Sequence, residues 1–373
     1  MKEIRKLGDF IQPVDVRNTD LSVTHLLGVS VEKRFIESIA NTIGTDFSKY
    51  KIVRKRQFTY IPDTSRRGDK IGIALLTDYD EGLVSNIYTV FEITDTSKLL
   101  PEYLMLWFSR PEFDRYARYK SHGSVREIFD WDEMCRVELP VPDIKEQQKI
   151  VDTYNAITNR IQIKQKINEN LSLQLATFYE KECSDDKSQN WKEVKLEELV
   201  ESKRNNIKVE DIPNNSLYVG LEHIPRKTLV LNSYGSTEEV LSNKLKASKY
   251  DILFGKIRPY FHKVSVNPFD EIYCSGDALV FNAKNKKNYG FVLLTLFSSD
   301  FVNYAVKLSN GAKMPRAEWK DLQNYVVKVP DEDIIRRMQF LVEKSLNLIF
   351  KNLDEIYKLN LVKQVIISQI SKR

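Results

Sequence analysis

The sequence contains an internal repeat, and this feature limits the possible folds more than any other. Landmark residues of the first half recur in the same order in the second half, 188 to 200 positions later. The last landmarks keep one offset of 188 residues, and the pairs are Gly123 with Gly311, Trp131 with Trp319, and Pro142 with Pro330. A chance likeness between two α/β domains would not keep one offset through a glycine, a tryptophan and a proline. We therefore predict a duplicated chain with two similar domains.

Earlier segments extend this repeat toward the N-terminus. The pairs are residues 7–9 with 196–198, 26–29 with 218–221, 49–52 with 249–252, and 79–81 with 269–271. A longer pair, 112–117 with 300–305, again has the offset of 188. The globular part of each repeat is therefore expected to be duplicated from its beginning to its end.

Each repeat is predicted to end in a long helix. After Pro142, Asp143 suits the N-cap position, and Glu146 three residues later completes a capping-box arrangement. The helix should then continue to about Glu182. Lys164 and Asn168 interrupt its apolar stripe where a heptad pattern requires apolar side chains. The stripe itself consists of Ile150, Tyr154, Ile157, Ile161, Leu171, Leu175 and Phe178.

The second repeat has a matching stripe after Pro330. It consists of Ile335, Met338, Val342, Leu346, Ile349, Leu353, Ile356, then Ile366 or Ile367, and Ile370. We expect the two stripes to pack against each other as an imperfect coiled coil. A helix of about 37 residues is about 55 Å long, which exceeds what one globular domain covers. We interpret the helices as spacers; the alternative is that each helix packs on its own domain.

The predicted order is domain, helix, domain, helix. Residues 1–142 and 193–330 are expected to be globular domains of mixed α/β (α+β) structure. Residues 143–183 and 331–373 are the predicted long helices, and the polar residues 184–192 are the linker between the repeats.

Hydrophobic patterns predict individual elements inside the two domains. Residues 83–93 and 278–281 alternate as strands do, whereas residues 100–116 and 290–306 have the period of amphipathic helices. The large aromatic side chains of these helices are expected in the core, and they are Trp107, Phe108, Phe297 and Phe301.

Composition excludes several classes of protein. The chain has 57 Lys and Arg against 52 Asp and Glu, and this net charge of +5 is too small to identify a nucleic-acid partner. The longest apolar run, residues 292–297, is far shorter than the ~20 residues of a membrane helix. The histidines are isolated, and Cys135, Cys183 and Cys274 form no CxxC pair, so we expect neither disulfides nor a metal site. The protein is expected to be cytoplasmic.

The usual catalytic motifs are missing from the sequence. A base methyltransferase needs a glycine-rich cofactor loop and an Asp or Asn followed by two prolines and an aromatic residue. Asn267-Pro268-Phe269 lacks the second proline, and the sequence has neither GxGxxG nor the GxxxxGKS/T phosphate loop. We expect that the chain is not an enzyme and has no cofactor of its own.

Basic residues interleaved with aromatic ones indicate binding instead. Arg and Lys reach phosphates and guanine edges, and glycine loops allow close approach of the backbone. We predict DNA contacts for one set in each repeat; a solvated basic face is the alternative. The set is Arg54, Lys55, Arg56, Tyr60, Arg66, Arg67 and Arg126 in the first repeat, and Lys256, Arg258, Tyr260, Lys313 and Arg316 in the second.

Two segments resemble a known family. Pro140-Val141-Pro142 with EQQKIV at 146–151, and YDILFGKIRP at 250–259, are similar to recurrent sequences of the specificity subunit of type I restriction-modification systems. The resemblance extends over the whole chain. It implies two target recognition domains that each read one half of a split DNA site, separated by two long helices packed as an antiparallel coiled coil.

The resemblance also implies partners and cofactors. Two methylation subunits would dock on the chain and bring S-adenosylmethionine, and restriction subunits would bring ATP and Mg. The second repeat departs from the family pattern, because it has Asp331 to Ile334 where the first has Glu146 and Gln147. We assign subunit docking and helix pairing to Glu146, Gln147, Ile150, Ile157, Ile161, Leu346, Ile349, Leu353 and Ile356.

Two other functions stay open at this point. The chain could be a self-contained DNA methyltransferase or nuclease, which binding of a methyl donor by the isolated chain would indicate. It could also be a coiled-coil adaptor with two protein-binding heads, which would have no salt-dependent affinity for DNA.

Overall fold

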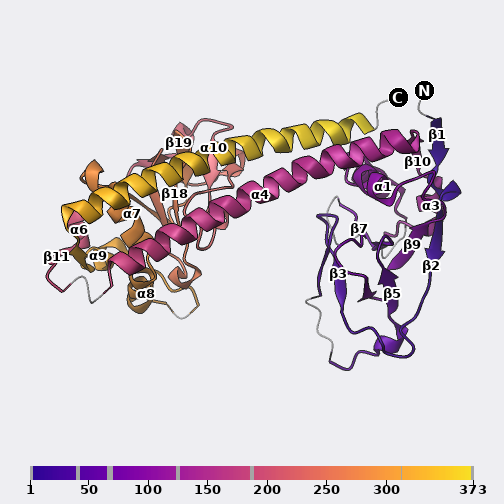
Figure 1. Cartoon of the computed structure of the whole chain (residues 1–373), viewed down its shortest axis with the longest axis horizontal. Helices are drawn as coiled ribbons and strands as arrows, with labels where there is room; N and C mark the ends of the chain where they lie inside the picture. The colour runs from indigo at the N-terminus through magenta and orange to yellow at the C-terminus, as the bar shows by residue number, and fades with distance from the viewer. Residues whose placement is uncertain are drawn as a thin grey trace. The chain divides into compact units, whose positions relative to one another are not determined.

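The computed structural model of the chain describes residues 3–38, 43–64, 70–122, 127–184, 189–311 and 313–370. It forms two compact units, whose elements are labelled in Figure 1. Unit 1 comprises Met1–Arg160 and Lys358–Arg373, and unit 2 comprises Ile161–Tyr357. The two boundaries between the units fall inside the long helices α4 (Ile144–Glu182) and α10 (Glu332–Ile370). Each unit therefore consists of one globular domain and part of each of these two helices.

Unit 1 contains a mixed α/β domain built on an antiparallel sheet of order β2-β9-β6-β7. Phe58 and Phe91 stack on this sheet with ring centroids 4.8 Å apart, and Phe108 meets both edge-on. The strands are β1 (Glu3–Lys6), β2 (Ile11–Val14), β3 (Leu27–Val29), β4 (Phe35–Glu37), β5 (Lys51–Arg54), β6 (Phe58–Tyr60), β7 (Ile73–Leu75), β8 (Glu81–Val84), β9 (Thr89–Ile93) and β10 (Glu138–Val141). The helices are α1 (Pro101–Phe108), α2 (Pro111–Lys120), α3 (Trp131–Arg136), the first part of α4 (Ile144–Glu182) and the end of α10 (Glu332–Ile370).

Unit 2 has the corresponding antiparallel sheet, β12-β20-β17-β18, and a second sheet of order β13-β16-β19-β14-β15. Its strands are β11 (Lys192–Lys195), β12 (Val200–Lys203), β13 (Asn206–Ile207), β14 (Leu217–Val219), β15 (Gly235–Ser236), β16 (Lys244–Ser248), β17 (Ile252–Gly255), β18 (Val264–Val266), β19 (Glu271–Cys274), β20 (Ala278–Ala283) and β21 (Val326–Val329). Its helices are the second part of α4, α6 (Leu196–Leu199), α7 (Tyr289–Phe297), α8 (Ser299–Leu308), α9 (Trp319–Leu322) and most of α10 (Glu332–Ile370).

The two domains share their topology, which confirms the predicted duplication. The pairing of β1 with β10 recurs as the pairing of β11 with β21. The strand β10 leads into the long helix α4, and β21 leads into the long helix α10. The left-handed residues recur as well: Arg56 and Tyr250 have φ of 69° and 68°, and Lys33 and Lys227 have 63° and 52°. Tyr250 therefore corresponds to Arg56, and the predicted match of residues 49–52 with 249–252 is wrong.

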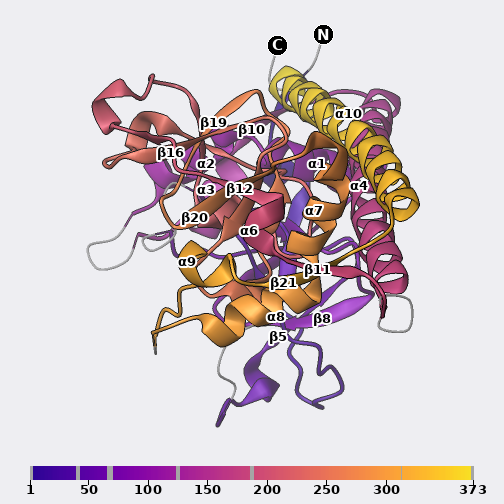
Figure 2. The same cartoon turned by 90° about the vertical axis from the view of Figure 1, so that its left-hand side faces the viewer.

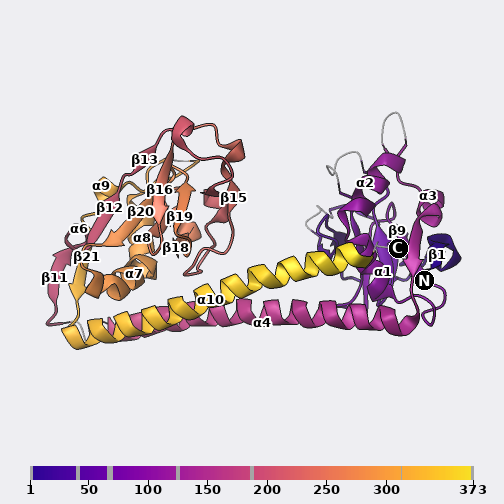
Figure 3. The ribbon, with the colours of Figure 1, turned by 90° about the horizontal axis from the view of Figure 1, so that it is seen from above.

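The helices α4 and α10 are each 39 residues long and pair within each unit. In unit 2, Leu175 of α4 shares a core with Met338, Val342, Leu346 and Ile349 of α10, and Figure 3 shows the two helices there side by side. In unit 1, Val151 of α4 shares a core with Ile370 of α10. The beginning of each helix thus pairs with the end of the other, so the pairing is antiparallel in each unit.

Two predicted helices are broken by local signals. Residues 100–116 form α1 and α2, because Arg110 precedes Pro111 and is held in an extended conformation. Residues 290–306 fall in α7 and α8, because Ser298 leaves the helical conformation and accepts a hydrogen bond from the Phe301 N–H as an N-cap. Residues 83–93 likewise form β8 and β9 rather than one strand.

The predicted aromatic core is confirmed: Trp107, Phe108, Phe297 and Phe301 are buried. Within the described ranges no single helix is long and apolar enough to cross a membrane. Lys286–Phe297 and Ser299–Leu308 meet the length and composition criteria only as a pair bent by 58°. All α7 side chains are buried in unit 2, as in the core helix of a globular domain.

Candidate nucleic-acid interface

Two loops lie side by side in unit 2 at the end of β17. Residues 256–262 form the first, and residues 310–311 with 313–317 form the described part of the second. The Ala317 N–H donates to the Lys256 carbonyl (2.9 Å), and the Arg258 N–H donates to the Pro315 carbonyl (2.8 Å). We term these segments the unit 2 loop pair. Because backbone bonds join the loops, their arrangement does not depend on exposed side chains.

Gly311 allows the second loop to turn sharply. Its φ is +115°, and a Cβ at this position would lie 3.1 Å from the Met314 carbonyl oxygen. Asn310 and Arg316 then exchange two backbone hydrogen bonds of 3.1 and 2.9 Å. This turn brings the basic residues of the second loop beside the first loop.

The structure brings together all the basic and aromatic residues predicted for the second repeat, namely Lys256, Arg258, Tyr260, Lys313 and Arg316. All of them except Lys256 are exposed. The Arg258 guanidinium donates to the Lys313 carbonyl (3.3 Å), which links the two loops a third time. Their contact with DNA remains a prediction.

Carboxylates near the loop pair hold two of its cations. Arg316 lies 3.5 Å from Asp277, and Lys256 lies 4.0 Å from Glu318. Solvent-accessible ion pairs of this length contribute little to stability. These side chains therefore lose little by exchanging a carboxylate for a phosphate or a base edge.

A third segment, the turn at residues 225–227, adds basic residues outside the predicted set. The Lys227 N–H donates to the His262 carbonyl (3.0 Å), which ties the turn to the first loop. The Arg226 guanidinium lies 3.9 Å from the centroid of the Phe261 ring. The basic pair after Pro225 is visible in the sequence, but no local pattern places it beside residues 35 positions later.

His262 anchors the first loop inside unit 2. The imidazole is buried, and its Nε2 donates to the Phe297 carbonyl at the end of α7 (2.8 Å). Burial lowers the pKa of this imidazole below its usual value. His262 is therefore a neutral structural residue, and the positive charge of this region comes from Arg and Lys.

Unit 1 has an equivalent loop pair. The Thr64 N–H donates to the Glu127 carbonyl (3.0 Å), and the Phe129 N–H donates to the Pro62 carbonyl (2.9 Å). His122 and Ile128 exchange the two bonds that Asn310 and Arg316 exchange in unit 2. Three predicted DNA-binding residues adjoin these segments in the sequence but lie outside the described residues: Arg66, Arg67 and Arg126.

The basic run Arg54, Lys55 and Arg56 does not join this loop pair. It precedes β6, whereas the loop pair follows β6, and its members lie 3.8, 3.3 and 3.2 Å from Glu81, Asp80 and Glu102 respectively. Arg56 also corresponds to Tyr250 in the repeat, not to the basic residues of the unit 2 loop pair. The first three cations of the set predicted for the first repeat therefore lie apart from the loop pair, and their contact with DNA remains a prediction.

Tyr60 is not a DNA contact. Its side chain is fully buried, edge-on to Phe91 and Phe129 with ring centroids 6.2 and 6.3 Å away. Burial raises the pKa of this phenol. The prediction failed because β6 is a central strand with both faces covered, which its aromatic pattern does not reveal.

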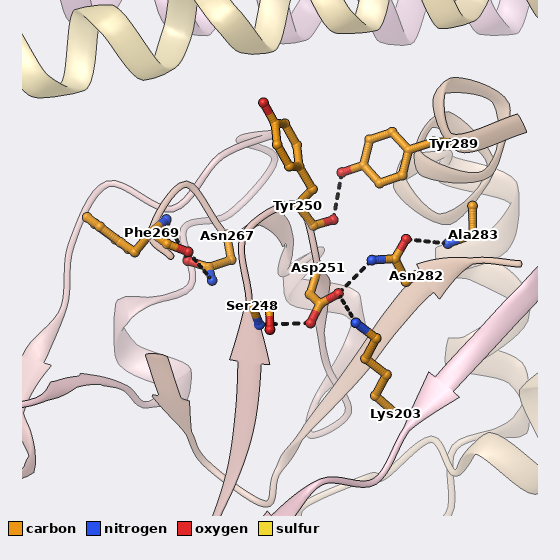
Figure 4. Close-up of polar contacts among 9 residues, drawn as sticks. All are labelled: Lys203, Ser248, Tyr250, Asp251, Asn267, Phe269, Asn282, Ala283 and Tyr289. Carbon is orange, nitrogen blue, oxygen red and sulfur yellow. Dashed lines mark hydrogen bonds and ion pairs between the residues drawn. The ribbon is translucent and has the colours of Figure 1, made fainter. Parts of the chain in front are cut away.

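A buried carboxylate stands at the other end of β17 (Figure 4). Asp251 accepts hydrogen bonds from Lys203 Nζ (2.7 Å), Asn282 Nδ2 (2.6 Å) and the Ser248 N–H (2.8 Å). Next to it, the Tyr289 hydroxyl donates to the Tyr250 carbonyl (2.8 Å). The ion pair is satisfied within the sheet and fixes the backbone that enters β17.

Unit 1 repeats this arrangement with amide and carboxylate exchanged. Gln57 occupies the position of Asp251: it accepts from the Arg54 N–H (2.8 Å) and donates to Glu92 (2.8 Å). Glu92 in turn occupies the position of Asn282. The polar pair is a duplicated structural device, because the same two strand positions are linked in both units.

The docking assignment for Gln147 is wrong. Its side chain is fully buried, donates to the Lys98 and Pro142 carbonyls (both 2.8 Å) and accepts from the Leu100 N–H (2.9 Å) at the start of α1. No surface remains for a partner. Ile161, Leu346, Ile349 and Ile356 are buried, and Leu353 and Ile150 pack on the cores of their units, in agreement with helix pairing.

In unit 2 a glutamine one turn further along its helix has the same role. The Gly290 N–H, at the start of α7, donates to Gln339 Oε1 (2.8 Å). Figure 2 shows α7 beside α10. The second repeat thus has no glutamine at the position that corresponds to Gln147. Gln339 nevertheless provides the same kind of contact, between the long helix α10 and the start of α7.

The described residues contain no cluster of three or more His, Cys, Asp or Glu side chains that could hold a metal ion. Comparison with known proteins then decides the family. The family described as "Type I restriction modification DNA specificity domain" matches residues 3–173 and again residues 188–366. The chain belongs to this family. Its two matches coincide with the two repeats, and the resemblance and fold class predicted from the sequence are confirmed.

Individual relatives agree with this assignment. The chain is 24% identical over 298 residues to the type I restriction enzyme MjaIX specificity subunit of Methanocaldococcus jannaschii, covering 73% of this chain and 68% of the relative. It is 24% identical over 173 residues to the EcoDI specificity subunit of Escherichia coli, covering 42% and 37%. The crystal structure of the type I S subunit from M. genitalium has the same fold, with a TM-score of 0.56, 12% identity, and coverage of 100% and 96%.

The family assignment has two direct consequences. The chain determines DNA sequence specificity within a type I restriction-modification system. Specificity subunits are not catalytic, so the prediction that the chain is not an enzyme is confirmed on that ground.

Proposed function

We propose that this chain reads a bipartite DNA target, with the loop pair of each unit contacting one half-site. The observation that carries this proposal is the duplication of the loop pair by matching backbone hydrogen bonds in both units. Two recognition elements of the same construction but different sequence suit two half-sites of different sequence. The target is then asymmetric.

The unit 2 surface has the chemistry that such reading requires. Arg258 and Arg316 supply planar donors for guanine edges or phosphates, and Lys313 supplies a point charge for a phosphate. Tyr260 is exposed beside them and offers a ring to bases or sugars. Because the backbone of the loop pair is fixed, binding orders few residues and costs little entropy.

We further propose that methylation subunits dock on exposed apolar surface of the helices. In unit 2, α10 exposes Phe340, Leu341 and Leu348, and a cavity of about 400 Å³ lies between Phe340, Leu341 and the two arginines before them. In unit 1, α10 exposes Leu361, Val362 and Val365. One such surface in each unit fits two methylation subunits. S-adenosylmethionine, ATP and Mg would then reside on methylation and restriction subunits.

The test is methylation mapping in cells that carry the chain and its partner subunits. Arg258→Ala should relax recognition at one half-site only, because a lost base contact costs about 1–3 kcal/mol of discrimination. Arg204→Ala, an exposed arginine of unit 2 outside the loop pair, is the matched control and should leave the methylated sequence unchanged. Equal loss at both half-sites from Arg258→Ala would contradict separate reading.

A further inference from the structure

A group of polar side chains occupies the seam between α4 and α10 in unit 2. Asn352 of α10 donates to Asn168 Oδ1 of α4 (2.8 Å) and accepts from Lys164 Nζ (3.0 Å). Lys164 also pairs with Glu355 (2.7 Å). Both asparagines are buried. We term Lys164, Asn168, Asn352 and Glu355 the polar layer, and its two members on α4 are the residues that interrupt the apolar stripe.

The apolar stripe alone does not define how the helices align. One heptad before the two α4 positions of the polar layer stand Ile157 and Ile161, and one heptad after them stand Leu171 and Leu175. A displacement of α10 by seven residues would therefore again place aliphatic residues opposite each other. Alignments that differ by a heptad therefore have similar apolar contacts between the two helices themselves.

The polar layer distinguishes between these alignments. A displacement by seven residues moves Asn352 from its place between Lys164 and Asn168 to a place between two isoleucines or between two leucines. The buried amides then lose their hydrogen bonds, and Lys164 loses its partners. Buried polar groups without partners are strongly unfavourable, so only the observed alignment satisfies the layer.

We propose that the polar layer fixes the register in which α10 pairs with α4, and with it the spacing between half-sites that the protein accepts. A single buried polar contact is an established determinant of register in coiled coils and reduces their stability. The consequence for spacing rests on the proposed function; the register itself does not.

The register can be measured as a distance within unit 2. Leu173 of α4 and Tyr357 of α10 are exposed and lie outside the polar layer. Spin labels would be attached to cysteines introduced at these two positions, after the native Cys135 and Cys183 are replaced by alanine. The contacts of Lys164 with Asn352 and of Arg337 with Phe178 place the two sites about 14 residues, or about 21 Å, apart along the helices. A heptad displacement changes this separation by about 10 Å.

The informative variant is Asn168→Leu with Asn352→Leu in the full chain. It should keep the helical content of the parent and a melting temperature at least equal to that of the parent. The distance between the two spin labels should then have two values, one as in the parent and one that differs from it by about 10 Å. The matched control makes the same two changes on exposed faces of the same helices, Asn170→Leu with Asn347→Leu, and should keep one distance. One unchanged distance in the layer variant would overturn the proposal.

A reciprocal exchange gives an independent test if the leucine variant does not fold. Asn352→Lys alone places two ammonium groups in the layer, whereas Lys164→Asn with Asn352→Lys restores a lysine–asparagine contact. The single variant should lose the parent distance and the double variant should recover it; equal behaviour of the two would overturn the proposal.

Methylation mapping of the leucine variant should then give a second spacer length. If the chain bound no DNA, the proposed function would fail while the distances still tested the register.

Discussion

At the residue scale, a buried charge needs a partner of opposite sign, and Asp251 has one in Lys203. Replacing Lys203 with Met should lower the free energy of unfolding by about 2 kcal/mol, because the carboxylate stays buried without its cation; the partly exposed lysine keeps the loss below that of a fully buried pair. Adding Asp251→Asn should recover part of the loss. Urea denaturation checks this, with the exposed Lys208→Met as control. Equal stability of Lys203→Met and the parent would contradict it.

His262 belongs to the same scale and gives a pH dependence. Its pKa is lower in the folded protein than its ordinary value of 6.5, so the unfolded chain binds more protons below that pH. The stability contributed by the neutral imidazole is complete above about pH 6.5. It decreases as the pH falls toward the pKa that His262 has in the folded protein, by at most about 1.4 kcal/mol per pH unit. Unfolding curves between pH 7 and 5 should show a smaller decrease for His262→Gln than for the parent. Identical slopes would show that His262 does not titrate differently on folding.

The individual residues also show where sequence reasoning succeeds. Asp143 was predicted as an N-cap from neighbouring residues, and it accepts hydrogen bonds from the Lys145 and Glu146 N–H groups (both 3.0 Å). Tyr60 was placed wrongly because its burial depends on strands that pair from distant parts of the chain. Arg226 was missed for the same reason, since its stacking partner follows 35 positions later.

At the scale of elements, each long helix caps a helix of its domain with a glutamine: Gln147 of α4 caps α1, and Gln339 of α10 caps α7. Gln147→Ala should lower the free energy of unfolding by about 2 kcal/mol, because it leaves the Leu100 N–H and two carbonyls without their partner in a buried place. Gln148→Ala, at the neighbouring exposed position, should have little effect. Thermal unfolding of both variants checks this, and a loss of equal size in the two would mean that the cap is unimportant.

The long helices were predictable as elements because period, cap and proline signals are all local. The positions of the breaks at Ser109 to Pro111 and at Ser298 were not, since the apolar period continues across them and conceals the local proline and serine signals. The shift of the capping glutamine from Gln147 to Gln339 was invisible as well. It depends on which turn of α10 faces α7, and only packing determines that.

At the scale of the whole molecule, the helix pair is predicted to determine the spacer of the DNA target. Seven residues inserted after Gln162 in α4 and seven after Asp354 in α10 keep both apolar stripes in phase and lengthen the pair by about 10 Å. With base pairs 3.4 Å apart, the spacer should grow by about three base pairs while both half-site sequences stay the same. Methylation mapping would show this. Insertion in α10 alone is the control, and an unchanged spacer in the matched variant would refute the role of the helices.

The polar layer also bears on how a duplicated chain keeps its halves together. Lys164 and Asn352 lie 188 positions apart, which is the offset of the repeat, so they stand at equivalent positions of the two copies. Two identical first halves pairing symmetrically would place ammonium against ammonium there, whereas unlike halves place ammonium against amide. The difference at this single position thus favours pairing between the two unlike halves of one polypeptide over pairing between two identical first halves.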